Sequence, residues 1–428
     1  MQKSDMPIAR KRTSGLSLFV FVLAVWGTLG SLSFSSGPDL LRANRTAEET
    51  DLVTGAARTE VYFPLLRGKR VGMVLNNTSQ IDGIRSVDSL LSGGIQVVKL
   101  FGPEHGFKGH YSAATPIDDS RDSQTGIPVV SLFGRHVKPT AADLQGVDVM
   151  VFDMQDVGVR FYTYLSTLHY VMEACAENQV PLLVLDRPNP NDFYVDGPIL
   201  EPQYRSFIGV DPLPVVHGLT LGEYARMVNG ECWLKDGIQC DLRVIPMLHY
   251  HHGMGYRLPR PPSPNLRDQQ AILLYPTLCL FGGTVISDGR GTYFPFEMIG
   301  NPRLKGKYAY CFTPVSIPGM TEHPPLQGKR CYGLDLRGFD TDILRRTGRL
   351  HLEWLLAFYK AYPDKAHFFV RELSADSTRI AYHIDALAGT DRLRKQIRAG
   401  KSLNTIRASW QPGLNAYKAM RKKYLLYR

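Results

Sequence analysis

A loop rich in glycine and proline carries the carboxyl group that is best suited to catalysis. Glu104 lies between Pro103 and Gly106, directly after the apolar run 95–100, and His105 follows it. Proline restricts the backbone and glycine permits tight turns, so the segment predicts a stiff loop at the end of a buried strand. Open α/β sheets bind ligands at such strand ends. Taken alone, the loop is better explained as a turn that holds a solvated acid, and the catalytic interpretation gains weight because the same pattern recurs along the chain.

Polar side chains follow three other apolar runs that we predict to be strands. They are Asn77 after residues 70–76, Asp153 and Asp156 after residues 147–152, and Asp186 after residues 180–185. The carboxyl ends of parallel strands share one edge of a sheet, so we expect these groups and Glu104 to converge on one crevice. Each aspartate alone is as well explained as the cap of the helix that follows.

The acids predict general acid or base chemistry. Neighbouring carboxylates raise one another's pKa, which suits a proton donor at neutral pH. The candidate catalytic residues are Glu104, Asp153 and Asp156, any of which could donate a proton or act as a nucleophile. The candidate substrate-binding residues are Asn77, His105, Arg160, Tyr162, Tyr164, Asp186, His217, Asn265 and Arg290. For Arg160 the alternative is neutralisation of a buried acid, and for the two tyrosines it is packing in the core.

Several functional classes are disfavoured by the motifs that the sequence lacks. It contains no nucleophile elbow of the esterase type, no phosphate-binding P-loop and no dinucleotide fingerprint. The histidines show no metal-ligand spacing, so we predict neither a metal nor another cofactor. The formal net charge is +10, and residues 391–428 carry eleven Lys and Arg against one acid. That tail is either a solvated helical face or a contact for an anionic polymer or membrane surface, and no motif indicates nucleic acid.

The N-terminal segment predicts export. Arg10, Lys11 and Arg12 precede the apolar residues 16–30, and small residues follow, as in a secretory signal peptide. The apolar stretch is short for a membrane span, although an uncleaved anchor stays open. We therefore expect a periplasmic or extracellular protein, which could be anchored to the membrane. The six cysteines form no CxxC pair, which argues against a zinc or redox motif.

Strand-like and helical patterns alternate through the first part of the mature chain. This alternation predicts an α/β fold with a mostly parallel sheet and helices on both faces. Thr220 and Glu223 fit a capping box at the start of one such helix. A proline-rich break at residues 259–264 precedes a part with fewer clean alternations, which predicts a smaller α+β domain. We expect a signal peptide or anchor at 1–36, a linker at 37–58, the first domain at 59–270 and the second at 271–428.

Long, ordered motifs in this chain resemble those of the exo-β-N-acetylmuramidase NamZ family, a former domain of unknown function. The motifs are FGPEHG around Glu104, VFDMQDVGVRFYTY at 151–164, LDRPNP at 185–190, VHGLTLGE at 216–223, PSPN at 262–265 and GRGT at 289–292. The resemblance extends from about residue 60 to the C-terminus. The chain departs from the family pattern at Asp288, where a glutamate is common, and at Gly282, near which an acid is common.

The resemblance implies a Rossmann-like first domain and a smaller second domain with the active cleft between them. It also implies release of N-acetylmuramic acid from the non-reducing end of peptidoglycan fragments, with Glu104 as the catalytic residue. Arginines such as Arg160 and Arg290 would suit the lactyl carboxylate of that sugar. A non-catalytic wall-glycan-binding protein is one alternative, and an esterase or amidase acting on muropeptides is a weaker one.

Overall fold

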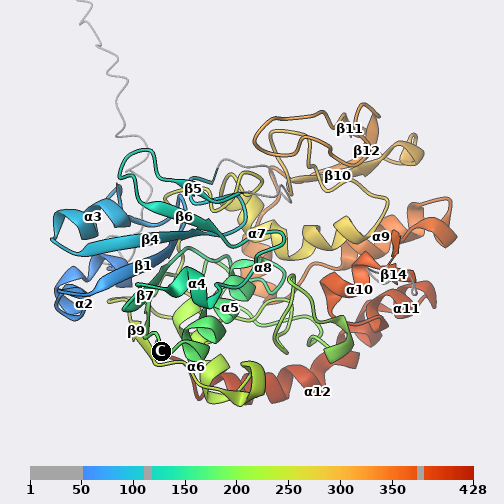
Figure 1. Cartoon of the computed structure of the whole chain (residues 1–428). Coiled ribbons are helices and arrows are strands. Elements are labelled where there is room, and N and C mark those ends of the chain that lie inside the picture. The colour runs from blue at the N-terminus through green and yellow to red at the C-terminus, as the bar shows by residue number, and fades with distance from the viewer. Residues whose placement is uncertain (1–51, 110–117, 374–379) are drawn as a thin grey trace, which may run out of the picture. The chain divides into compact units, whose positions relative to one another are not determined.

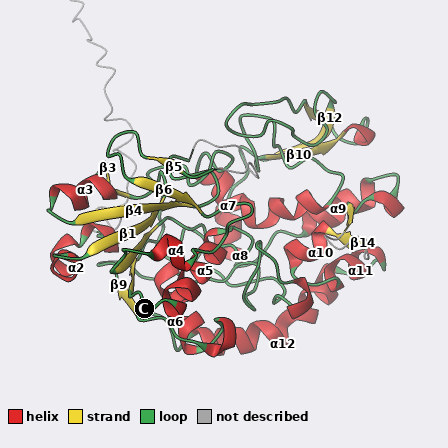
Figure 2. Ribbon diagram, in the orientation of Figure 1, coloured by secondary structure: helices red, strands yellow, loops and turns green. Residues whose placement is uncertain are grey.

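The computed structural model describes residues 52–109, 118–373 and 380–428. Residues Thr46–Arg428 form one compact unit. Its centre is a seven-stranded sheet in the order β5-β6-β4-β1-β7-β8-β9, shown in Figures 1 and 2. The strands are β1 (Arg70–Leu75), β4 (Gln96–Gly102), β5 (Ser120–Arg121), β6 (Pro128–Ser131), β7 (Val149–Asp153), β8 (Leu182–Leu185) and β9 (Leu242–Ile245). Only the β5–β6 pairing in this sheet is antiparallel. The predicted α/β class and mostly parallel sheet are therefore confirmed.

Both faces of the sheet are buried, as its near-continuous apolar strands predict. In β7, Val149 and Val151 point into one core while Met150 and Phe152 point into the other, because successive side chains of a strand alternate between faces. The first core is covered by α2 (Thr59–Leu66) and α3 (Ser86–Ser92). The second is covered by α5 (Tyr164–Glu177) and α6 (Leu221–Gly230). A short helix, α4 (Ala141–Leu144), precedes β7.

The second half of the chain is a smaller mixture of helices and antiparallel strands, also as expected. It opens with α7 (Gln269–Leu278) and contains a sheet in the order β10-β12-β11. The strands of this half are β10 (Met298–Asn301), β11 (Tyr310–Phe312), β12 (Cys331–Asp335) and the pair β13 (Arg371–Leu373) and β14 (Ile380–Tyr382). The remaining helices are α8 (Asp342–Thr347), α9 (Glu353–Ala361), α10 (His383–Ala388), α11 (Arg392–Arg398) and α12 (Leu403–Arg421).

The two halves share one core. Leu274 of α7, Phe358 of α9 and Trp410 of α12 belong to the same buried cluster as the α5 face of the sheet. After α12 the chain returns to the first half, and the C-terminus lies beside α6 and β9 (Figure 1). The tail is held there by the Leu426 amide, which donates to Glu223. Removal of the tail would therefore expose part of the first half.

The predictions about export, membrane anchoring and the cysteines can be compared with the described part of the chain. The signal peptide or anchor at 1–36 lies outside the described residues. Within the described ranges, no helix combines the length and the hydropathy needed to cross a bilayer. The six cysteines all lie within the described residues and are free thiols.

Candidate active site

A pocket of about 180 Å³ opens where β4 ends, between the two halves of the chain. The first half contributes the Glu104 loop, the residues before α5 and a turn before α7. The second half contributes α7, the loop that follows it and the start of α10. The lining residues are Glu104, His105, Phe161, Tyr162, Thr163, Ile208, Ser263, Asn265, Leu266, Tyr275, Cys279, Gly282, Arg290, Phe296, His383 and Leu387.

The Glu104 loop is the stiff turn that its sequence predicts. His105 and Gly106 both have left-handed backbone conformations, with φ of 70° and 72°, which a residue with a Cβ adopts at a cost. The Gly106 amide donates to the Pro103 carbonyl at 2.9 Å and closes the turn. A side chain at Gly102 would come within 2.9 Å of the Phe107 amide nitrogen. The sharp reversal after β4 therefore turns Glu104 into the pocket.

Thr163 fixes the carboxyl group of Glu104. Its hydroxyl donates to Glu104 Oε2 at 2.9 Å. Thr163 is the N-cap residue of α5, yet its side chain makes no capping bond to that helix. The hydroxyl is therefore committed to the glutamate. It orients the acid without bringing a formal charge next to it.

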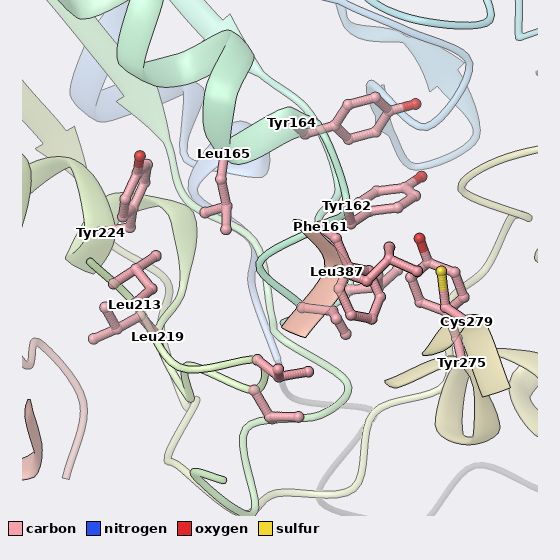
Figure 3. Close-up of a cluster of buried hydrophobic side chains, with 14 of the residues drawn as sticks. Phe161, Tyr162, Tyr164, Leu165, Leu213, Leu219, Tyr224, Tyr275, Cys279 and Leu387 are labelled. Carbon is pink, nitrogen blue, oxygen red and sulfur yellow. The ribbon is translucent and has the colours of Figure 1, made fainter. Parts of the chain in front are cut away.

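Two tyrosines at the start of α5 pack against each other beside the pocket. The hydroxyls of Tyr162 and Tyr164 both donate to the Pro262 carbonyl, at 2.9 and 3.2 Å, and their ring centroids lie 4.6 Å apart. Asn76 donates to the Tyr164 hydroxyl at 2.8 Å. Burial raises the pKa of both tyrosines, so they stay neutral. Of the two, only Tyr162 lines the pocket, next to Tyr275 (Figure 3).

Arg290 supplies a cation to the lining of the pocket. It forms an ion pair with Asp288, and its guanidinium carbon lies 4.7 Å from the centre of the Phe296 ring. Burial opposes the charge, but the neighbouring Asp288 carboxylate raises the pKa of Arg290. About a quarter of the side chain stays exposed (27%). The arginine is therefore charged, is held in place by Asp288 and Phe296, and is exposed enough to bind an anionic group.

Asp153 and Asp156 lie near the expected sheet edge but do not line the pocket. The Asp153 side chain is fully buried and contacts Arg187 Nε at 2.6 Å. Asp156 accepts from the Gly158 amide at 2.6 Å and lies 3.5 Å from His217 Nε2. Both are thus tied to neighbouring groups beneath the surface. His217 is buried with Asp156 and does not line the pocket either.

Asp186 acts as a helix cap. It accepts hydrogen bonds from the Gly222 amide at 2.8 Å and from the hydroxyls of Thr220 and Tyr427, at 2.7 and 2.6 Å. Burial raises the pKa of this carboxyl to about 6, against the effect of these donors. The N-cap residue of α6 is Thr220, and Asp186 adds an acceptor to the same helix start from 36 positions away in the chain. The predicted capping box of Thr220 and Glu223 is confirmed there.

Two other predicted binding residues also lie outside the pocket. Arg160 is 1% exposed and donates to three backbone carbonyls, those of Pro198, Leu213 and Leu387. Burial lowers its pKa to about 9. Arg160 joins the two halves of the chain. The three groups that accept hydrogen bonds from its guanidinium are all backbone carbonyls, and none is a carboxylate. Asn77 instead borders a second pocket on the other side of the Glu104 loop.

The structure brings Glu104, His105, Tyr162, Asn265 and Arg290 together in one pocket. The sequence motifs could also have indicated Thr163, since it lies in the same stretch as Tyr162. Tyr275, Cys279 and His383 had no such signal, because they come from helical segments of the second half. Within the described residues, no group of three or more His, Cys, Asp or Glu side chains is arranged to hold a metal ion.

Sequence comparison relates both halves of the chain to one family. Residues 71–270 match the model for the N-terminal part of exo-beta-N-acetylmuramidase NamZ, and residues 273–427 match that for its C-terminal part. The peptidoglycan beta-N-acetylmuramidase NamZ of Bacillus subtilis (strain 168) is 38% identical over 432 residues, which cover 96% of this chain and 99% of that protein.

Solved structures agree with this relationship. A DUF1343 family protein from Bacteroides fragilis NCTC 9343 superimposes with a TM-score of 0.80 at 43% identity, covering 88% of this chain and 99% of the other. A second DUF1343 family protein from the same strain has a TM-score of 0.73 at 27% identity, with the same coverage of both chains. The fold described above is therefore that of these proteins over nearly their whole length.

Proposed function

This chain belongs to the exo-β-N-acetylmuramidase NamZ family, and from that premise we propose that Glu104 is the general acid of its glycosidase reaction. The reaction is the release of N-acetylmuramic acid from the non-reducing end of peptidoglycan fragments. The observation that carries the proposal is the carboxyl group of Glu104, held by Thr163 at the rim of a pocket. Glycosidases need such an acid to protonate the departing sugar oxygen.

The charge of the pocket supports an anionic sugar as the ligand. Arg290 is the lining residue with a fixed positive charge, and N-acetylmuramic acid differs from N-acetylglucosamine by a lactyl carboxylate. A guanidinium group binds a carboxylate through two parallel hydrogen bonds. We infer that Arg290 receives the lactyl group, while Tyr162 and Phe161 present apolar surface to the ring. Asn265 and His105 are the lining residues best suited to bind hydroxyl or acetamido groups.

The reaction also needs a second catalytic group beside the general acid. That group must come from another side chain, from water or from the substrate. Asp153 and Asp156 were the sequence candidates, but each is engaged with a neighbouring group outside the pocket. Glycosidases that act through two protein carboxylates have both groups flanking the scissile bond. Glu104 is therefore the carboxyl group to which we assign proton transfer, and we assign no role in bond cleavage to the aspartates.

Replacement of Glu104 by glutamine tests the proposal. The amide keeps the shape of the side chain and still accepts from Thr163, but it cannot donate a proton in the same way. We expect release of N-acetylmuramic acid from a defined disaccharide to fall by about 10³-fold or more, with unchanged thermal unfolding. Unchanged turnover would reject Glu104 as the acid.

The same assay separates the alternatives. A wild-type chain that binds the disaccharide but never releases a sugar would be a glycan-binding protein. Mass analysis of products would reveal an esterase or amidase, because the glycosidic bond would survive. We also propose that the chain is exported, since peptidoglycan lies outside the cytoplasmic membrane and the basic and apolar residues at 10–30 have the pattern of a signal segment. Fractionation of cells that express the full chain would test this.

A further inference from the structure

A second pocket lies on the other side of the Glu104 loop, and nothing in the proposed reaction yet uses it. Its volume is about 390 Å³. Its lining includes Asn77, Arg85, Phe107, Lys108 and Arg260. These residues come from the carboxyl end of β1, the start of α3, the Glu104 loop and the segment before α7.

The two pockets are neighbours across one short stretch of chain. Glu104 lines the first pocket, and Phe107 and Lys108, only three and four positions later, line the second. The proline-rich segment connects them as well. Asn77 in the second pocket donates to the Pro261 carbonyl at 3.0 Å, and Tyr162 in the first donates to the next carbonyl, that of Pro262. A ligand that extends past Glu104 from the first pocket would therefore reach the second.

The second pocket carries positive charge. Lys108 donates to the Ser123 hydroxyl at 2.8 Å and Arg260 donates to Gln80 Oε1 at 2.6 Å. Both partners are neutral, and neither cation has an ion pair among the described residues. Among the residues that the structure describes, no acid lines this pocket. Two exposed cations that line one pocket favour an anionic ligand.

Arg85 gives the pocket a rigid side. Its guanidinium binds Asp88 at 2.7 Å and Asp122 at 3.2 Å, so its own charge is compensated and its position is fixed. Phe107 adds an apolar surface, with Lys108 Nζ 5.5 Å from the ring centre. Apolar surface next to a cation suits a sugar that bears a carboxylate, because such a ligand presents both C–H groups and a negative charge.

We propose that this second pocket binds the saccharide chain on the leaving side of the scissile bond, through the carboxylate of its next muramic acid residue. The proposal rests on the proposed function, because it takes Glu104 as the acid at that bond. Peptidoglycan strands alternate N-acetylglucosamine with N-acetylmuramic acid. A strand cleaved at its terminal muramic acid therefore carries its next carboxylate two sugars along the departing part. Lys108 and Arg260 receive that carboxylate.

The test compares two substrates with the full chain. One is a tetrasaccharide with N-acetylmuramic acid at its non-reducing end, whose departing trisaccharide contains the second carboxylate. The other is the disaccharide, whose departing sugar has none. We expect the wild-type protein to have a lower KM for the tetrasaccharide. In the Lys108→Ala, Arg260→Ala double variant, that KM should rise about tenfold, while kcat and the disaccharide kinetics stay as in the wild type. Tenfold corresponds to about 1.4 kcal/mol of binding free energy.

A matched control removes an exposed lysine elsewhere. Lys401→Ala, between α11 and α12, should leave both substrates unaffected. Added salt should abolish the preference for the tetrasaccharide, because exposed charges are screened. Reduction of the second carboxyl group to an alcohol should also abolish it in the wild type.

The outcomes separate this inference from the proposed function. If the wild type releases sugar from both substrates with equal KM, and the double variant does the same, the second pocket has no such role while the glycosidase stands. If the wild type releases no sugar, the proposed function fails. Calorimetric titration with the tetrasaccharide then shows independently whether the second pocket binds the saccharide chain. Binding that does not depend on Lys108 and Arg260 would overturn the inference about this pocket.

Discussion

The hydroxyl of Thr163 donates a hydrogen bond of 2.9 Å to Glu104 Oε2 and so joins the start of α5 to the loop after β4. The two residues are 59 positions apart in the chain. The contact exists because β7, which leads to α5, and β4 flank β1 in one parallel sheet. The sheet thus brings an acid and the neutral donor that orients it to the same edge.

Removal of that donor should slow the reaction without unfolding the protein. Thr163→Val keeps the volume of the side chain but loses the hydroxyl, so the Glu104 carboxyl would sample other rotamers. We expect kcat for the disaccharide to fall about fivefold, in line with the loss of one neutral hydrogen bond of about 1 kcal/mol. The midpoint of thermal unfolding should change little, because Thr163 makes no side-chain capping bond to α5.

Thr167→Val is the matched control for that variant. Thr167 lies one turn further along α5, and its hydroxyl donates to the Thr163 carbonyl at 3.2 Å. Its loss should leave kcat close to the wild-type value. Equal effects of the two substitutions on kcat would mean that the helix, and not the hydrogen bond to Glu104, matters for turnover.

The pairing of Arg290 with Asp288 predicts a second effect. Asp288→Asn would leave the guanidinium in a largely buried place without its carboxylate partner. We expect a loss of about 2 kcal/mol in the free energy of unfolding, smaller than for a fully buried pair because Arg290 is partly exposed. Urea denaturation would measure it.

Arg290→Lys separates the charge of that residue from its shape. Lysine keeps one positive charge but loses the planar fork that binds a carboxylate through two bonds. We expect KM for the disaccharide to rise at least fivefold with a smaller change in kcat. A chromogenic N-acetylglucosaminide, which has no lactyl group, serves as the comparison. If KM for the muramic acid substrate did not change, Arg290 would not bind the lactyl group.

Asp153 is where sequence and structure lead to different expectations. Asp153→Asn removes the charge that compensates the buried Arg187, and breaking a buried pair typically costs about 3 kcal/mol or more. We expect a large loss of stability in urea, with kcat per folded molecule within a few-fold of the wild-type value. A fall of 100-fold in kcat at unchanged stability would instead restore Asp153 as a catalytic residue.

The sequence was informative about the sheet because its strands are short apolar runs followed by polar turns. β1, β4, β7 and β8 were all recognisable from that pattern. β9 was missed, because Leu242–Ile245 is a short edge strand with alternating, half-exposed side chains. Such a strand does not stand out from a loop in composition.

The residues of the site could be predicted only where they lie in a recognisable sequence motif. Glu104 and Arg290 lie in glycine-rich loops, and both line the pocket. Arg160, by contrast, has the residue type of an anion-binding group, but its guanidinium is used to bind three carbonyls. His383 lines the pocket from α10, which no strand-end argument could anticipate. Residue type can suggest chemistry, but burial and partners depend on contacts between distant segments.

His252 pairs with the glutamate that holds the C-terminal tail, and its charge should make stability depend on pH. His252 lies between Asp192, 3.1 Å from its Nδ1, and Glu223, 2.9 Å from its Nε2. Glu223 also accepts from the Leu426 amide, and Arg421 lies close to the same imidazole. Burial acts against the charge, but the two carboxylates outweigh burial and raise the pKa of His252 to about 9.

The sign of the effect follows from the two pKa values. An unfolded histidine has a pKa of about 6.5, so the stabilisation is complete below that pH and is lost as pH rises through about 9. The free energy of unfolding should therefore fall between these values, by at most about 3 kcal/mol. His252→Gln should be less stable at pH 6 and should lack most of this decline. His367→Gln, which alters an exposed histidine, should keep it. A His252→Gln variant that retained the full decline would assign the pH dependence to other groups.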